Sequence, residues 1–480
     1  MKEKIIKNYL YSLVYQVLTV LIPLVTTPYI SRILTSDEIG IYDYSLTICT
    51  YFMFAASAGI PTLAQRDVVL YGRKQSECFS YYYLLRLILT SIVWIVYCTV
   101  VVLWFEDKWI FIIQGIGLLA SGFDISWYYA GRENFKIITN RNILFKIASL
   151  FLLFAFVKGQ NALFFYTLSI TLPNLIGNFL LFWKLDVKII WTRVPLRRII
   201  ATLKDSITLL IPSLVLQLYS IIDKTILGSF STMGELGYYA QTFKVVNLLV
   251  LASSTFGTVL FPQMVRLYHE SKEKLCDLTS KSVDIIVHVF LLPAFGIAAC
   301  ADVFSKWFYG SNYIGINQLL VISMPIAIFK ALSYLTANQA MIASNREEDL
   351  IKVICGGTLL NCILDMLLVK PFGAMGAIYA TAFSEVLIFI VSIILFKNKI
   401  GYIKLINIDN VRAVIAAIAE YIGIVLIKRC LVIENAFMET FLLGMVGVII
   451  YISLLKFQRD TYYLNARKTC LNYVKRGQKK

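Results

Sequence analysis

Charged side chains are scarce in this sequence of 480 residues, and their scarcity excludes an ordinary soluble protein. Only 15% of the residues are charged and 59% are hydrophobic, whereas a soluble chain carries about 25% charged residues. Histidine is nearly absent: His269 and His288 stand alone, with no cysteine or acidic cluster in metal-ligand spacing. The nine cysteines are scattered, without a Cys-x-x-Cys pair. We therefore expect no metal site, no cofactor and no disulfide framework.

Sequence motifs of catalysis and of ATP hydrolysis are also missing. No Gly-x-x-x-x-Gly-Lys-Ser/Thr loop occurs, so the chain itself is not an ATP-driven pump. No Ser/His/Asp or Cys/His arrangement is visible, and no large outer loop could hold a polymerising site. These absences favour a transporter over an enzyme.

Long apolar runs dominate the sequence instead. Each is about twenty residues long, the length that crosses roughly 30 Å of hydrocarbon. The pattern predicts an all-α integral membrane protein with about fourteen transmembrane helices. Their approximate limits are 8–33, 39–63, 80–105, 109–130, 138–157, 161–183, 206–230, 236–262, 282–301, 315–342, 350–369, 374–396, 411–430 and 437–456.

The net charge of +16 is explained by membrane topology. With the N-terminus inside, most of the 45 Lys and Arg residues fall in cytoplasmic segments, which is the usual orientation signal. An even number of spans then places both termini in the cytoplasm. A nucleic-acid partner is not expected.

Two segments of the chain resemble one another. SRILTSDEIGIYDYS (31–45) lies near the outer end of the first span, and DKTILGSFSTMGELGYYAQTFK (223–244) near the outer end of the seventh. A Glu-x-Gly-x-Tyr motif recurs between them, and AGRENF (130–135) has a weaker echo in SNREED (344–349). Both copies run in the same direction, so we expect a parallel internal repeat, which is typical of transporters. The residues that match at an offset of 197 are Glu38 with Glu235, Gly40 with Gly237, and Tyr42 with Tyr239.

The repeat suggests how the chain is organised. We expect an N-lobe (1–183, spans one to six), a cytoplasmic amphipathic linker (184–205), a C-lobe (206–396, spans seven to twelve), two accessory spans (411–456) and a basic cytoplasmic tail (457–480).

The linker carries apolar residues at helical spacing. They fall on one helical face, which we expect to lie in the membrane interface while neighbouring cations reach anionic headgroups. A plain basic loop is the alternative. The apolar residues are Leu196, Ile199, Ile200 and Leu203.

Proline pairs occupy corresponding places in the two halves. Pro23 corresponds to Pro212, and Pro61 to Pro262. Proline inside a helix removes a hydrogen bond and kinks the helix, so we expect hinges at these four positions. Ordinary membrane prolines, whose freed carbonyls are satisfied by neighbours, are the alternative.

Five basic residues lie inside predicted spans: Arg86, Lys146, Lys224, Lys244 and Lys330. A cation near a bilayer centre costs about 2.5–3.5 kcal/mol on insertion scales, so these side chains must face protein or a watery cavity. Lys146 and Lys330 lie near mid-span, whereas Lys224 and Lys244 could snorkel to the outer surface. A cavity lined by such residues expects a negatively charged passenger.

Two arginines lie at span ends, where they could be ordinary flanking residues. Arg32 is at the outer end of span one and matches Lys224 if the second loop is five residues longer, and Arg66 is at the inner end of span two. Acids also occur in spans, as charge partners or as ion sites that drive transport. They are Asp43, Asp124 and Asp223, which we select for these roles, and Asp365, Glu385 and Glu420.

Specific stretches of the chain resemble a known family. PLVTTPYISRILTSDEIGIYDYS (23–45), continued to the Gly59-Ile60-Pro61 end of span two, resembles the bacterial polysaccharide repeat-unit flippases. These belong to the multidrug/oligosaccharidyl-lipid/polysaccharide exporter superfamily. WYYAGRENF (127–135) looks like a second family stretch. The resemblance covers essentially the whole chain and is detailed over spans one to five.

The resemblance implies a MATE-like pair of six-helix lobes around a central cavity, plus two C-terminal helices. Members move undecaprenyl-pyrophosphate-linked oligosaccharides from the inner to the outer leaflet of the bacterial cytoplasmic membrane, for capsule, O-antigen or exopolysaccharide synthesis. It implies membrane lipids, a coupling ion (H⁺ or Na⁺), a polysaccharide polymerase and chain-length machinery as partners. The residues expected to contact pyrophosphate or acidic sugars are Arg32, Arg66, Arg86, Lys146, Lys224, Lys244 and Lys330.

Three alternatives stay open. A drug or cation antiporter of the same superfamily would typically carry a carboxylate in its first span, where this chain has none between Lys4 and Arg32. A major-facilitator transporter would have twelve spans and leave the repeat unexplained. A membrane-bound polymerase or acyltransferase would show a large outer loop or a catalytic histidine.

Overall fold

The protein is described here by a computed structural model covering residues 2–70, 75–190, 195–405, 407–430 and 433–464. Within these ranges every regular element is a helix and none is a strand, which confirms the all-α class. Contacts divide the chain into two compact units, Met1–Gly237 and Tyr238–Lys480, and each unit is described by itself. The limits of the predicted lobes stay a prediction.

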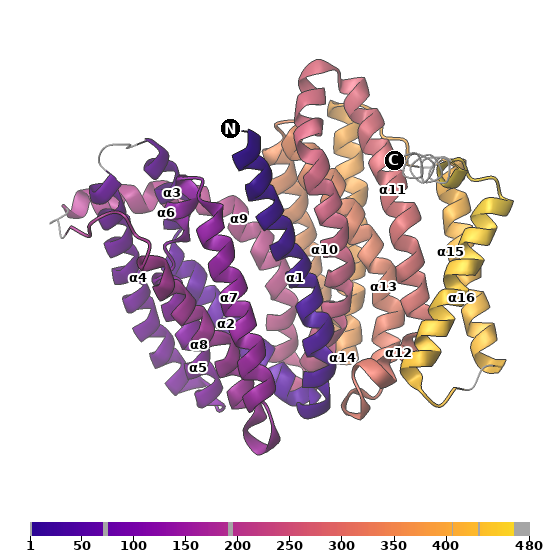
Figure 1. The fold of residues 1–480 in the computed structure, drawn as a ribbon, viewed down its shortest axis with the longest axis horizontal. Coiled ribbons are helices and arrows are strands. Elements are labelled where there is room, and N and C mark those ends of the chain that lie inside the picture. The colour runs from indigo at the N-terminus through magenta and orange to yellow at the C-terminus, as the bar shows by residue number, and fades with distance from the viewer. Residues whose placement is uncertain (1, 71–74, 191–194, 406, 431–432, 465–480) are drawn as a thin grey trace, which may run out of the picture. The chain divides into compact units, whose positions relative to one another are not determined.

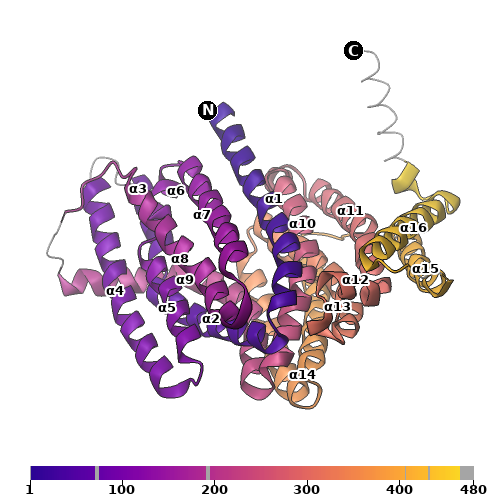
Figure 2. The same cartoon turned by 60° about the horizontal axis from the view of Figure 1, so that its bottom comes forward.

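The first unit consists of helices that pack along one another (Figure 1). Helix α5 packs against α2 and α8, and α7 packs against α1 and α8 (Figure 2). The elements are α1 (Lys2–Ile33), α2 (Ser36–Ser57), α3 (Ile60–Leu70), α4 (Gln75–Trp104), α5 (Lys108–Gly122), α6 (Ser126–Gly131), α7 (Phe135–Phe156), the 3-10 turn η2 (Gly159–Asn161), α8 (Ala162–Phe182) and α9 (Leu196–Phe230).

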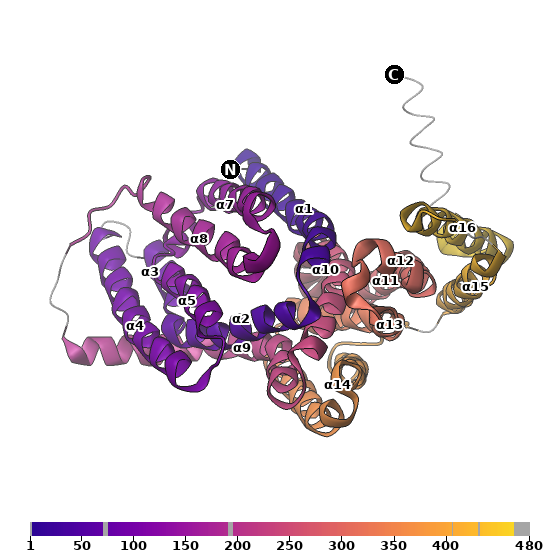
Figure 3. The ribbon, with the colours of Figure 1, turned by 90° about the horizontal axis from the view of Figure 1, so that it is seen from below.

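The second unit begins within α10 and ends with a pair of helices, α15 and α16, that lie side by side (Figure 3). Both members of this pair also pack against α11. The elements are α10 (Met233–Glu270), α11 (Lys272–Ala299), α12 (Ala301–Phe308), the 3-10 turn η3 (Ser311–Tyr313), α13 (Ile316–Ser333), the π-helical segment η4 (Tyr334–Met341), α14 (Glu347–Lys399), α15 (Ile408–Cys430) and α16 (Ala436–Phe457).

Eleven helices in the described ranges are long and apolar enough to cross a membrane, so the chain is a multi-pass membrane protein. One of them, α14, contains both predicted spans 350–369 and 374–396. The backbone leaves helical geometry at Gly373, which lies between these two spans. The predicted first and seventh spans lie in α1 and α9, where some side chains fall outside the described residues. The count of fourteen therefore stays a prediction.

The repeated Glu-x-Gly-x-Tyr motif marks the start of a helix in both copies. Thr35 caps α2: its Oγ1 accepts a hydrogen bond from the Glu38 amide at 3.3 Å, and Glu38 Oε2 accepts one from the Thr35 amide at 2.8 Å. In the second copy Thr232 Oγ1 accepts from the Glu235 amide at 3.2 Å. Such caps satisfy amide donors that a helix start leaves unpaired. The motif therefore fixes where α2 and α10 begin.

The two motif glycines lie against each other's loops. A Cβ added at Gly40 would stand 1.8 Å from the Met233 carbonyl oxygen, and one at Gly237 would stand 1.9 Å from the Ser36 carbonyl oxygen. Only a residue without a side chain permits this backbone approach. The two copies of the repeat thus meet reciprocally where α2 and α10 begin.

The four prolines selected as hinges lie in different settings. Pro23 and Pro262 are inside α1 and α10, and Pro212 is within α9, although its side chain is outside the described residues. Pro61 is the second residue of α3, where no intrahelical hydrogen bond is lost. At Pro61 the chain bends just before the proline, through Ala58 and Gly59 with φ of 43° and 76°. The hinge role stays a prediction.

The amphipathic end of the predicted linker is the first part of α9, a single helix from Leu196 to Phe230. Ile199 and Leu203 pack on the core of the first unit, whereas Ile200 is exposed. The Arg198 guanidinium lies 4.8 Å from the centre of the Tyr81 ring, and Tyr81 Oη donates to Thr202 Oγ1 at 2.7 Å. Part of this face therefore packs against protein.

Candidate functional site

Two buried arginines contact one aspartate, Asp124, on the predicted cytoplasmic side of the first unit. Arg86, on α4, donates from Nη1 to the Asp124 backbone oxygen at 2.6 Å. Arg141, on α7, lies with Nη2 at 3.4 Å from Asp124 Oδ1 and donates from Nη1 to Asn178 Oδ1 at 2.6 Å. Both guanidinium groups are buried. We call these four residues the arginine cluster; it carries one positive charge in excess.

A break between two helices positions Asp124. Helix α5 ends at Gly122, α6 begins at Ser126, and Asp124 Oδ1 accepts the Ser126 amide at 2.9 Å. The Gly122 position is crowded, because a Cβ there would stand 2.8 Å from the Thr90 side chain. This close approach of α5 to α4 brings Arg86 to the free carbonyl of Asp124.

Sequence reasoning missed Arg141 and Asn178. Arg141 is the fourth residue of the predicted span 138–157 and is not among the site residues expected from the sequence, yet it is buried. Asn178 sits in the apolar run of α8 and donates to the Ala120 backbone oxygen at 2.7 Å. The polar amide of Asn178 within an apolar span is the sequence signal that indicates a buried polar contact, because such groups need hydrogen-bond partners.

The predicted outer side of the first unit holds an ion pair. Lys224 Nζ on α9 lies 2.5 Å from Asp43 Oδ1 on α2, with side chains 25% and 5% exposed. Tyr51 Oη and Thr225 Oγ1, 2.8 Å apart, join the same two helices deeper in the unit. Asp43 thus serves as a charge partner, one of the two roles predicted for it.

The other predicted residues of the first unit are placed separately. Lys146 Nζ on α7 donates to Thr19 Oγ1 on α1 at 2.7 Å. Arg32 is exposed at the end of α1 and donates to the Pro28 backbone oxygen. Arg66 is 58% exposed on α3, with Nε 3.3 Å from Asp67 Oδ1. Asp223 is buried on α9.

In the second unit, Lys330 lies on α13 just before the π-helical segment η4. Its Nζ is 3.8 Å from Glu385 Oε1 on α14 and 5.5 Å from the centre of the Phe243 ring. Glu385 is buried. Lys244 is half-buried on α10. A cation near mid-span is therefore held by a buried acid and an aromatic face.

The stretch WYYAGRENF forms part of the predicted cytoplasmic edge of the first unit. Trp127 and Tyr128 are buried in an aromatic cluster with Phe79, whose ring stacks on Trp127. Tyr128 Oη donates to Asp186 Oδ1 at 2.7 Å, and Arg132 pairs with the other carboxylate oxygen. Although desolvation opposes it, the hydrogen bonds from Arg132 and Tyr128 lower the pKa of Asp186. This contact fixes the chain after α8.

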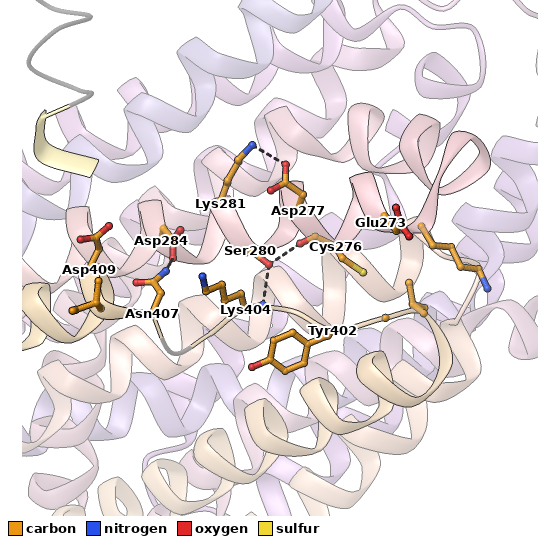
Figure 4. A pocket seen from close by; sticks show the side chains of 14 residues that line it. Glu273, Cys276, Asp277, Ser280, Lys281, Asp284, Tyr402, Lys404, Asn407 and Asp409 are labelled. Atoms are coloured by element: carbon orange, nitrogen blue, oxygen red, sulfur yellow. Dashed lines mark hydrogen bonds and ion pairs between the residues drawn. The ribbon is translucent and has the colours of Figure 1, made fainter. Parts of the chain in front are cut away.

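A cavity of about 650 Å³ lies in the second unit between the start of α11 and the segment that joins α14 to α15 (Figure 4). Its lining carries both signs of charge. Lys281 pairs with Asp277 at 2.7 Å, and Asp284 Oδ1 accepts from Asn407 at 2.8 Å. The Ser280 hydroxyl accepts from the Lys404 amide at 3.0 Å. These mutual contacts hold the segment against α11.

A family model described as "Polysaccharide biosynthesis protein" matches residues 5–268, which is more than half of the chain. The chain belongs to this family. Within the curated relatives, a "Putative O-antigen transporter" of Escherichia coli (strain K12) is 21% identical over 82% of this chain and 97% of its own length.

Solved structures establish the fold of this family member. A lipid II flippase MurJ in an inward closed conformation matches with a TM-score of 0.76 at 13% identity, over 95% of this chain and 100% of that chain. An inward-facing multidrug resistance MATE family transporter of the MOP superfamily matches with a TM-score of 0.64 at 14% identity, over 79% and 94%. The predicted MATE-like fold is confirmed.

Proposed function

We propose that this member of the polysaccharide biosynthesis family is a flippase for lipid-linked oligosaccharides. It moves undecaprenyl-pyrophosphate-linked repeat units from the inner to the outer leaflet of the bacterial cytoplasmic membrane, with both chain termini in the cytoplasm. The relative named as an O-antigen transporter supports this class of passenger. Transport, rather than an enzyme activity, also agrees with the absence of catalytic motifs from the sequence.

The observation that carries the proposal is the arginine cluster. Two buried guanidinium groups contact Asp124, Arg141 through the carboxylate and Arg86 through the backbone oxygen, so an anion that approaches from the cytoplasmic side meets net positive charge. At an effective dielectric constant of 20, one cation 4 Å from a unit negative charge attracts it by about 4 kcal/mol. Guanidinium groups also match the geometry of phosphate oxygens. A pyrophosphate headgroup is the passenger that this cluster suits.

The other cations extend this attraction along the path. We assign contacts with pyrophosphate or acidic sugars to Lys146, Lys224, Lys244 and Lys330, and to Arg32 and Arg66 at the two membrane surfaces. Weak single contacts suit a carrier, because the passenger must be released after each step. Asp43 and Asp124 pair with cations in the present conformation, and Asp223 is the third acid assigned to charge pairing or to the coupling ion, H⁺ or Na⁺.

A small-molecule antiporter is the second candidate, because the chain shares its fold with the MATE transporter. The net positive charge of the arginine cluster favours the flippase, because it suits an anionic passenger and not a cationic one. α1 holds no carboxylate between Lys4 and Arg32, where a cation antiporter would typically carry one.

The deciding experiment removes the chain from its cells and follows the lipid-linked oligosaccharide. We expect it to accumulate on the inner leaflet, and plasmid-borne wild-type chain to restore export. Arg86→Ala and Arg141→Ala should restore little, while Arg66→Ala, at an exposed position, retains more. Normal arrival of the oligosaccharide at the outer leaflet without the chain contradicts the proposal.

A further inference from the structure

A buried carboxyl group in the second unit stands apart from every basic side chain assigned above. Glu420, on α15, is 1% exposed. Its Oε2 has no hydrogen-bond partner in the described part of the chain, and no described cation forms an ion pair with either of its oxygens. The Glu420 side chain points between α11 and α16, the two helices that flank α15.

Two glycines make room for this carboxyl group. A Cβ at Gly296 on α11 would stand 3.0 Å from Glu420 Oε1, and one at Gly447 on α16 would stand 2.9 Å from the same oxygen. Any other residue at Gly447 would press on the carboxyl group. The carboxyl oxygen therefore lies against bare backbone on both sides, in a place that offers no positive charge.

The charged and titratable groups around Glu420 are engaged elsewhere. Lys428, two turns along α15, pairs with Asp302 of α12 at 2.7 Å. The Tyr451 hydroxyl on α16 donates to the His288 backbone oxygen at 3.0 Å. Cys300, which follows the last residue of α11, is a free cysteine, and Glu439 lies in the first turn of α16. None of these side chains is within hydrogen-bonding distance of Glu420.

Beside the carboxyl group lies an apolar groove of about 330 Å³ that Glu420 helps to line. Most of its other lining is aliphatic or aromatic, including Pro293 and Phe304, with Thr440 and Cys300 as the remaining polar side chains. The groove connects the carboxyl group with the outside of the helix packing. Water that enters this groove reaches the carboxyl group, so the groove is the route for a proton to and from Glu420.

We infer that Glu420 is a reversible proton-binding site between α15, α11 and α16. An ionised carboxylate without a partner is too costly in such a site, so the closed packing holds the neutral acid. Binding forms one O–H bond on the carboxylate with a proton taken from water. Release returns that proton to water once the groove is hydrated and α16 moves off α11. Helix packing and protonation are thus linked.

Infrared spectroscopy of the full-length protein in lipid nanodiscs tests the site directly, because only protonated carboxyl groups show the carboxylic-acid C=O band. We expect wild-type protein at neutral pH to show a band that is absent from Glu420→Gln, that shifts in D₂O, and that disappears on alkaline titration. Glu434→Gln, in the exposed connection after α15, should keep it. No Glu420-dependent band, or a band unchanged by D₂O and pH while the protein stays folded, overturns the proposal.

A second pair of variants tests the geometry without removing the acid. Gly447→Ala places a methyl group against Glu420 Oε1, whereas Gly444→Ala, one turn away on α16, meets nothing within 4 Å. We expect Gly447→Ala to push the carboxyl group toward the groove and shift the midpoint of its titration to lower pH by at least one unit. Gly444→Ala should titrate like wild type. Equal midpoints for the two variants contradict the assignment.

The use of this proton to drive transport rests on the proposed function. In proteoliposomes with lipid-linked oligosaccharide, Glu420→Gln should lose the acceleration that a pH gradient gives to wild type, while retaining transport without a gradient. Gradient-driven transport by Glu420→Gln removes Glu420 from coupling. If wild-type protein moves no oligosaccharide at all, the proposed function fails, whereas the infrared result on the proton site still stands.

Discussion

At the scale of single residues, two acids of the first unit, Asp43 and Asp124, contact three of its basic side chains. Asp43 Oδ1 lies 2.5 Å from Lys224 Nζ, and Asp124 contacts Arg141 through its carboxylate and Arg86 through its backbone oxygen. A buried charge is tolerated when it is paired and hydrogen-bonded. These pairs keep the cations in place in the present conformation.

The Lys224–Asp43 pair leads to a prediction about stability. Lys224→Met leaves a buried carboxylate without its cation, and removing one partner of a buried pair costs about 3–5 kcal/mol. Asp43→Asn should cost less, because the Lys224 side chain is 25% exposed and reaches water. The double variant should regain much of the loss. Thermal unfolding of the purified variants measures this order; equal losses for both single variants would contradict it.

The contact of Asp186 with Arg132 and Tyr128 predicts a dependence on pH. The folded protein lowers the pKa of Asp186 from its ordinary value of 3.8, so the contact stabilises the fold at neutral pH. That stabilisation is lost as pH falls through the lowered pKa. Because Asp186 is 52% exposed, the effect is small, about 0.2–1 kcal/mol for such pairs. The difference in melting temperature between wild type and Asp186→Asn should therefore shrink steadily on acidification below pH 4.

At the scale of elements, the repeated motif has a structural explanation. Thr35 with Glu38, and Thr232 with Glu235, begin α2 and α10 with the same type of cap. Gly40 and Gly237 then allow each helix start to approach the loop of the other copy. The motif therefore holds two corresponding helix starts together.

This reciprocal contact predicts that Gly40→Ala and Gly237→Ala are both destabilising. Each adds a methyl group less than 2 Å from a carbonyl oxygen, and overpacking of this kind costs about 1–3 kcal/mol. Gly356→Ala, with nothing within 4 Å, is the matched control. Thermal unfolding compares the three variants. Unchanged stability of Gly40→Ala would show that the two loops are not in contact.

Cross-linking tests the same contact in the membrane. A Cβ at Gly234 would stand 3.4 Å from Ser36 Oγ, which is close to the spacing in a disulfide. We expect the Ser36→Cys/Gly234→Cys variant to form an intramolecular disulfide readily under mild oxidation. Each single-cysteine variant serves as its control for reaction with the native cysteines.

The break in α14 gives a prediction for a backbone position. Gly373 has φ of 54° and ψ of −133°, a region that residues other than glycine enter only at a cost of about 1–3 kcal/mol. Gly373→Ala should lower the melting temperature. Gly356→Ala, at an open helical position of the same element, should leave it unchanged or raise it slightly. A lower melting temperature for Gly356→Ala than for Gly373→Ala would contradict a backbone break at Gly373.

Much of the fold could be predicted from the sequence, because apolar runs report membrane helices directly. The arrangement of polar side chains could not. The sequence does not single out Arg141, because its partners, Asp124 and Asn178, come from outside its own helix and are 17 and 37 residues away. The position of a residue along its span predicts its depth in the membrane. It does not predict which side chains of other helices contact it.

At the scale of the whole molecule, cations at mid-span occur in both units. Lys146 donates to Thr19 in the first unit, and Lys330 lies near Glu385 in the second. A passenger that crosses the bilayer with a charged headgroup needs attraction near the centre, where desolvation is most costly. Under the proposed function these two lysines would supply this attraction from the two halves of the chain, so we expect transport to depend on both.

We therefore predict that Lys146→Met and Lys330→Met each reduce export of the lipid-linked oligosaccharide at least tenfold. Each variant loses an attraction of about 4 kcal/mol between the lysine and a unit negative charge. A tenfold change requires only about 1.4 kcal/mol. Lys330→Met alone also removes the cation beside the buried Glu385. The double variant Lys330→Met/Glu385→Gln therefore separates transport from stability, and we expect it to fold and still fail to export. Lys158→Ala and Lys352→Ala, at exposed positions, are the controls. Membrane levels of each variant and outer-leaflet oligosaccharide are measured together. Wild-type export by both mid-span variants would exclude these lysines from the path of the passenger.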